Sequence, residues 1–131
     1  MSTTERPDRL HVCRDTTPGP HRTDSNDIEW WLPVIGPTAT ILAFTLVRRT
    51  DPTGTIWHTE PLAQRIGLAG NRSKLWASLD RLDRFGIIQF HATDVLTIRT
   101  HLPALTDRQL TRLPDDLAAR YPATHLTTVP A

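Results

Sequence analysis

Five basic side chains crowd one short segment, residues 65–84, where only Asp80 and Asp83 are acidic. The basic residues are Arg65, Arg72, Lys74, Arg81 and Arg84. This local excess of positive charge indicates contact with a polyanion, because phosphate binding follows the local field rather than the net charge. The alternative is a solvated helix face with internal ion pairs, since Asp80 and Arg84 have the i,i+4 spacing.

The other reactive side chains form no catalytic or metal-binding pattern. The six histidines, which lack the spacing of a metal site, are His11, His21, His58, His91, His101 and His125. Cys13 is the only cysteine, which excludes an intrachain disulfide. There is no glycine-rich phosphate loop, nucleophile elbow or Cys–His pair. We therefore expect no enzyme activity, no bound metal and no cofactor.

The totals fit one compact domain: 131 residues carry 15 basic and 14 acidic side chains. The most apolar stretch, residues 32–47, contains prolines and is shorter than the roughly 20 residues that a membrane-spanning helix needs. The polar N-terminus lacks the apolar run of a signal peptide. We expect a cytoplasmic protein with no membrane partner. Its arginines greatly outnumber its single lysine, which is associated with GC-rich bacteria.

The basic segment is expected to be positioned by an amphipathic helix over residues 71–85. Leu75, Leu79 and Leu82 recur at the spacing of one helical face, and a mostly polar, cationic face lies opposite. Gly86 is typical of a helix end, and a strand follows. The hairpin register that buries one face pairs Ile88 with Ile98 and Phe90 with Leu96. It places Gln89, His91, Thr97 and Arg99 on the outer face and Asp94 at the tip.

Local signals also predict the flanking elements. A short helical turn follows Asp27, and a largely apolar helix spans residues 37–49, with proline at its first position. A turn at 51–54, a strand at 55–58 and a helix at about 60–66 come next. Two short helices are expected after Pro103. We predict a disordered tail over 1–27, because this segment has almost no apolar content, and one domain over 28–121. Residues 122–131, which carry no charge apart from a possible His125, are expected to form a flexible C-terminal tail.

One motif connects these elements to a known superfamily. Residues 62–68, Leu-Ala-Gln-Arg-Ile-Gly-Leu, precede the amphipathic helix and the Phe-Gly-Ile-Ile start of a strand at 85–88. This succession resembles the winged helix-turn-helix superfamily of DNA-binding domains. The resemblance implies an α+β, mainly α fold with a short β-hairpin wing and C-terminal helices. The chain departs from the pattern in a longer turn and in having Trp76 and Ala77 on the second helix.

The resemblance implies a transcription regulator that binds double-stranded DNA and inserts helix 71–85 into the major groove. The residues expected to contact base edges are Arg72, Ser73 and Lys74, with Ser78 and Arg81 as further candidates. The residues expected to contact phosphate are Thr59, Arg65, Arg84 and Arg99. A single domain of this size offers few contacts, so a homodimer is expected through helix 37–49 or the C-terminal helices.

A second hypothesis is a winged-helix module that binds protein and not DNA. It is motivated by the near-neutral net charge, by Asp94 at the hairpin tip and by three tryptophans. Trp30, Trp31 and Trp76 are the candidate contacts for such a partner, because aromatic side chains are enriched at protein interfaces. The alternative, which we favour for Trp76, is burial: we expect one of Trp30 and Trp31 to enter the core and Trp76 to pack at its edge.

Overall fold

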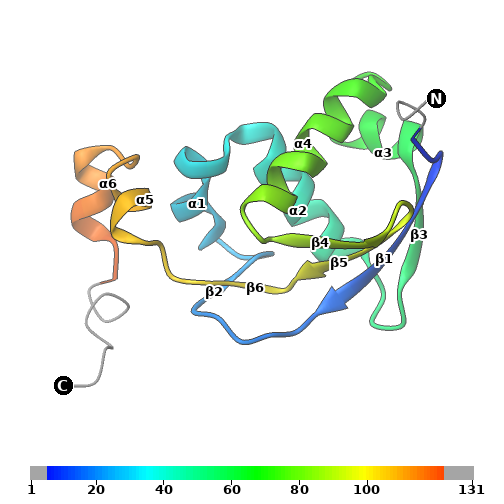
Figure 1. The fold of residues 1–131 in the computed structure, drawn as a ribbon. Coiled ribbons are helices and arrows are strands. Elements are labelled where there is room, and N and C mark those ends of the chain that lie inside the picture. The colour runs from blue at the N-terminus through cyan, green and yellow to red at the C-terminus, as the bar shows by residue number, and fades with distance from the viewer. Residues whose placement is uncertain (1–5, 123–131) are drawn as a thin grey trace.

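The computed structural model describes residues 6–122, which form a mixed α+β fold (Figure 1). Helices cover one face of a four-stranded sheet. The strands are β1 (Arg9–Asp15), β2 (His21–Arg22), β3 (Thr55–His58), β4 (Ile88–Ala92), β5 (Val95–Arg99) and β6 (His101–Leu102). The helices are α1 (Ile28–Ile35), α2 (Pro37–Arg49), α3 (Thr59–Arg65), α4 (Arg72–Arg84), α5 (Asp107–Leu110) and α6 (Asp115–Arg120). Within residues 6–122, no helix has the length and apolar character needed to cross a membrane.

The N-terminal segment provides an inner strand of the sheet, whose order is β3-β1-β5-β4. β1 pairs antiparallel with β3 and parallel with β5. Leu10 and Val12 are fully buried, because alternate side chains of a strand point to the same face. The predicted disordered tail over 1–27 is therefore wrong for the described part of that segment, and the predicted domain boundary at 28 is too late. Residues 1–5 lie outside the described residues.

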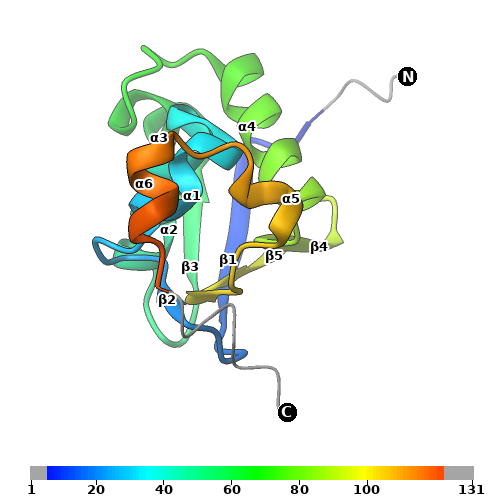
Figure 2. The same ribbon diagram turned by 90° about the vertical axis from the view of Figure 1, so that its left-hand side faces the viewer.

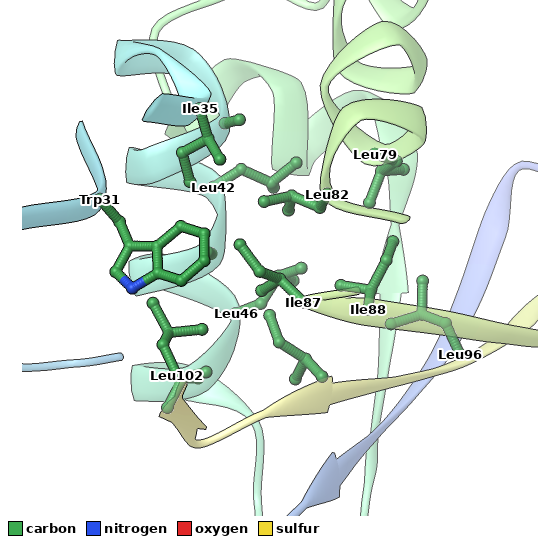
Figure 3. Packing of buried hydrophobic residues seen from close by; sticks show 14 of the residues in the cluster. Trp31, Ile35, Leu42, Leu46, Leu79, Leu82, Ile87, Ile88, Leu96 and Leu102 are labelled. Atoms are coloured by element: carbon green, nitrogen blue, oxygen red, sulfur yellow. The ribbon is translucent and has the colours of Figure 1, made fainter. Parts of the chain in front are cut away.

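The leucine face of α4 packs into the core, as its periodicity predicts. Leu75, Leu79 and Leu82 are fully buried. Figure 3 shows the last two pointing toward Leu42 of α2 and toward the apolar side chains of the sheet. At about 25 cal/mol per Å² of apolar surface, each buried leucine contributes about 1.5–3 kcal/mol. The opposite face of α4 is consequently turned outward.

The hairpin forms with the predicted register. Ile88 pairs with Ile98 and Phe90 with Leu96. The register shifts between Phe90 and Ala92, so that Ala92, and not His91, faces Val95. His91 instead lies on the outer face, 3.0 Å from Thr97 Oγ1. The predicted outer face is therefore confirmed at this pair.

The two short C-terminal helices lie at the end of the molecule away from α3 (Figure 1). Figure 2 views the molecule from that end, with α5 and α6 nearest the viewer. A capping box, in which Thr106 and Gln109 bond reciprocally, starts α5. Tyr121 anchors the end of α6: its hydroxyl accepts the N–H of Leu105 at 2.8 Å and lies 2.7 Å from Nε2 of the buried His21. Residues 123–131 of the predicted C-terminal tail lie outside the described residues.

The position of β1 can be tested by truncating one of its side chains. We expect Leu10→Ala to lower the free energy of unfolding by about 2–5 kcal/mol, because it leaves a cavity in the core. The neighbouring His11 points to the exposed side, so His11→Ala should change that free energy by less than about 0.5 kcal/mol. Urea denaturation measures both values. Equal effects of the two substitutions would contradict a buried β1.

Tyr121 is the only tyrosine, so its ionisation can be followed alone. Burial raises the pKa of its phenol above 10.0, the Leu105 hydrogen bond opposes this, and the charge of Asp27 adds to the rise. Because the folded state holds the proton to higher pH, this contribution to stability is complete below the unfolded pKa and is lost as pH rises through the folded pKa. Phenolate absorbance should therefore titrate later in native protein than in urea. Coincident titrations would exclude this burial.

Candidate nucleic-acid interface

α4 begins at a capped N-terminus after a tight turn from α3. The turn between the two helices contains three residues with positive φ, which are Gly67, Ala69 and Gly70. Asn71 then caps α4, because its side-chain oxygen accepts the N–H of Lys74 at 3.1 Å. Ala63 of α3 is fully buried. These features direct the polar face of α4 to solvent.

Arg72, the first residue of α4, is held by the segment before β1. Its guanidinium forms an ion pair with the carboxylate of Asp8 at 3.0 Å. It also donates to the carbonyl oxygens of Arg6 and Pro7, at 3.2 and 3.3 Å. The side chain predicted to read base edges is thus partly neutralised and oriented by residues that sequence reasoning placed in a disordered tail.

Arg6 covers the adjacent flank of α4. Its guanidinium lies 4.7 Å from the centre of the Trp76 ring and forms an ion pair with Asp80 at 3.2 Å. Trp76 itself is buried and stacks on Phe90 of β4, with ring centroids 6.0 Å apart. A groove of about 560 Å³ remains between this flank and the hairpin. The N-terminal segment therefore joins α4 to the hairpin.

Three cations remain available on the outward side of α4. Lys74 and Arg84 are exposed, and Arg81 is half-buried with its guanidinium 5.9 Å from the Phe85 ring. In residues 6–122, none of the three forms an ion pair with an acidic side chain. Asp80 pairs with Arg6 and not with Arg84. The structure therefore contradicts the alternative in which Asp80 and Arg84 form an ion pair within the helix.

Ser73 and Ala77 lie on the same outward face and are exposed, so an approaching partner can reach the helix backbone. Arg65 is also exposed, on α3, with its guanidinium 5.9 Å from the Trp57 ring. Lys74, Ser73 and Ala77 occupy the N-terminal half of α4. This is the half expected to approach base edges in a helix-turn-helix complex.

Besides Arg72, three predicted contact residues are buried or bonded within the fold. Thr59 is buried, and its backbone N–H and hydroxyl both donate to the carbonyl of Asp8, at 2.9 and 3.2 Å. Thr59 is therefore not free for the predicted phosphate contact in this arrangement. Arg99 lies at the base of the hairpin and donates to the carbonyls of His101 and Pro18. Ser78 is buried on the side of α4 that faces α2, so base contact by this residue is excluded in this arrangement.

The tryptophans do not form an exposed aromatic surface. Trp31 and Trp76 are buried, because they fill the core beneath α1 and α4. Trp30 is half-buried and packs edge-on against Tyr121, with ring centroids 5.3 Å apart. The expected burial of Trp76 and of one residue of the Trp30–Trp31 pair is confirmed, and the alternative of a partner contact through Trp31 or Trp76 is contradicted. Of these three tryptophans, Trp30 keeps some exposure.

No cluster of three His, Cys, Asp or Glu side chains in residues 6–122 is arranged to hold a metal ion. The outward face of α4 offers hydrogen-bond donors and positively charged side chains. Comparisons with protein families, with curated proteins and with solved structures give no match to this chain.

Proposed function

We propose that this chain is a winged helix-turn-helix protein that binds double-stranded DNA through the outward face of α4. The observation that carries the proposal is the strip formed by Lys74, Arg81 and Arg84, which we call the α4 strip. Its cations have no acidic partner in the described residues, whereas the nearby Asp8 and Asp80 are neutralised by arginines. Unpaired cations on one face release counterions from a nucleic acid and thereby favour binding.

The order of elements from α2 to β5 supports the same proposal. A helix, a strand, two helices and a hairpin follow one another as the winged helix-turn-helix resemblance implies. An α-helix fits the major groove, where base edges differ in donors and acceptors. Ser73 and Lys74 contact base edges in this proposal, and Arg81 and Arg84 contact phosphate. Arg72 joins them when Asp8 is displaced.

The proposed role is a cytoplasmic transcription regulator that acts as a homodimer. A dimer supplies two copies of the α4 strip, which raises the number of phosphate contacts per complex. α2 offers a surface for such a dimer, because Ile41 is 44% exposed and lies on the same helix as the half-buried Phe44.

A protein-binding module is the second candidate, and two observations favour it. Asp8 neutralises Arg72, which lowers the positive charge at the start of α4. Leu32, Ile41 and Ile56, on α1, α2 and β3, are exposed large apolar side chains, and apolar side chains supply contact area in protein interfaces. Absence of duplex binding at low salt would favour this candidate.

Salt dependence of binding to a generic duplex tests the DNA proposal. We expect Arg81→Ala and Arg84→Ala each to reduce the slope of log K against log salt by about 0.9, because each removes one phosphate contact. Fluorescence anisotropy with a labelled duplex measures the slope. Arg108→Ala and Arg112→Ala are the matched controls: they remove the same charge from exposed positions at the α5 end of the molecule. Equal slopes in all four variants would contradict the proposal.

The same assay includes a variant that should strengthen duplex binding instead of weakening it. Asp8→Asn removes the negative charge beside Arg72 and should tighten duplex binding several-fold. The Asp8 side chain is largely exposed, and the Thr59 hydrogen bonds use only the Asp8 backbone, so folding should be preserved. Asp116→Asn on α6 makes the same charge change at a distance. An equal gain in both variants would show that only net charge matters.

A further inference from the structure

The start of α2 faces the inner edge of the α4 strip across an open groove of about 410 Å³. Polar groups from both helices line it: Thr38 and the Ala39 backbone belong to α2, and Ser78, Arg81 and Arg84 belong to α4. No acidic side chain is among the residues that line the groove. It therefore combines two guanidinium groups with a helix N-terminus.

The N-terminus of α2 has uncapped amide donors. Pro37 has no N–H, and the first intrahelical bond runs from Thr40 N–H to the Gly36 carbonyl at 3.1 Å. The amides of Thr38 and Ala39 have no hydrogen-bond acceptor in residues 6–122. Gly36 supplies no side-chain cap, and the first turn has no acidic residue. The positive end of this 13-residue helix is thus unneutralised.

Two side chains of α4 bring further donors without partners to the same groove. Ser78 is only 7% exposed, and its hydroxyl makes no hydrogen bond in the part of the chain that the structure describes. The Nε–H of Arg81 is buried and also lacks an acceptor. Of these two groups only the Arg81 Nε–H is a buried donor without an acceptor, which is unfavourable, so an acceptor that reaches it is stabilised. The Ser78 hydroxyl is a further donor at the groove.

We propose that the groove is a binding site for a phosphate group. A phosphate offers acceptor oxygens in several directions, which suits donors that arrive from a helix N-terminus, a hydroxyl and two guanidinium groups. The site takes the terminal phosphate of a small molecule or a phosphodiester of a nucleic acid, because both present the same oxygens. It rests on the proposed function for Arg81 and Arg84, and it goes beyond that proposal by adding donors from the N-terminus of α2 and from Ser78.

Titration with inorganic phosphate at constant ionic strength tests the site. We expect saturable nuclear magnetic resonance shifts at the amides of Thr38 and Ala39 and at the Arg81 Nε–H. Chloride at the same ionic strength should leave these signals in place. Shifts that fail to saturate, or that chloride reproduces, would overturn the proposal, because they report general screening.

Two variants separate binding from folding. Arg81→Ala should weaken phosphate affinity at least about tenfold, because a charge-assisted hydrogen bond is lost. Thr38→Asp places a negative charge in the groove and should abolish binding, whereas an acidic residue in a first helical turn favours the helix itself. Arg112→Ala is the control and should bind phosphate as the native protein does. Unchanged affinity in a folded Thr38→Asp variant would overturn the site.

A competition experiment identifies the source of the phosphate. If inorganic phosphate displaces a short duplex and Thr38→Asp weakens duplex binding, the site holds a phosphodiester of DNA. If phosphate binds and the duplex is unaffected or does not bind, the site serves a small phosphorylated molecule. Either result supports the site, and the second also counts against the proposed use of the groove by DNA. Loss of phosphate binding alone overturns the site without deciding whether the α4 strip binds DNA.

Discussion

The burial of the leucine face of α4 is the constraint on which the surface chemistry depends. Leu75, Leu79 and Leu82 occupy the space between α2 and the sheet, and each is fully buried. A helix that is fixed on one face cannot rotate, so its opposite face must point to solvent. The positions of Lys74 and Arg84 therefore follow from apolar packing. The outward polar face of α4 is thus a consequence of how its leucine face packs in the core.

The segment from α2 to β5 was predictable because its signals are local. A glycine followed by proline starts α2, leucine spacing defines α4, and alternation defines β4 and β5. The hairpin register followed from burying Ile88 and Phe90 on one face, and only the shift beside Ala92 was missed. That shift adds an unpaired residue near the tip, which a pairing rule of period two does not include.

The role of the N-terminal segment was not predictable in the same way. Leu10 and Val12 do alternate with polar residues, but the surrounding charges suggested disorder. Their burial depends on pairing with β3 and β5, which lie more than forty residues away in sequence. The contacts of Arg72 with Asp8 and of Arg6 with Asp80 depend on that same pairing. Local pattern alone therefore identified the cations of α4 but not the groups that neutralise some of them.

The most direct test of the outward cationic face is a map of where a duplex touches the folded chain. Backbone amide shifts measured by nuclear magnetic resonance, with and without a short DNA duplex, provide that map. If α4 faces the DNA, the largest changes fall at Ser73, Lys74 and Ala77 and extend to Arg84, while α5 and α6 keep their signals. Changes centred on Ile41 of α2 or on α6, with α4 unaffected, would contradict the assignment of DNA binding to α4.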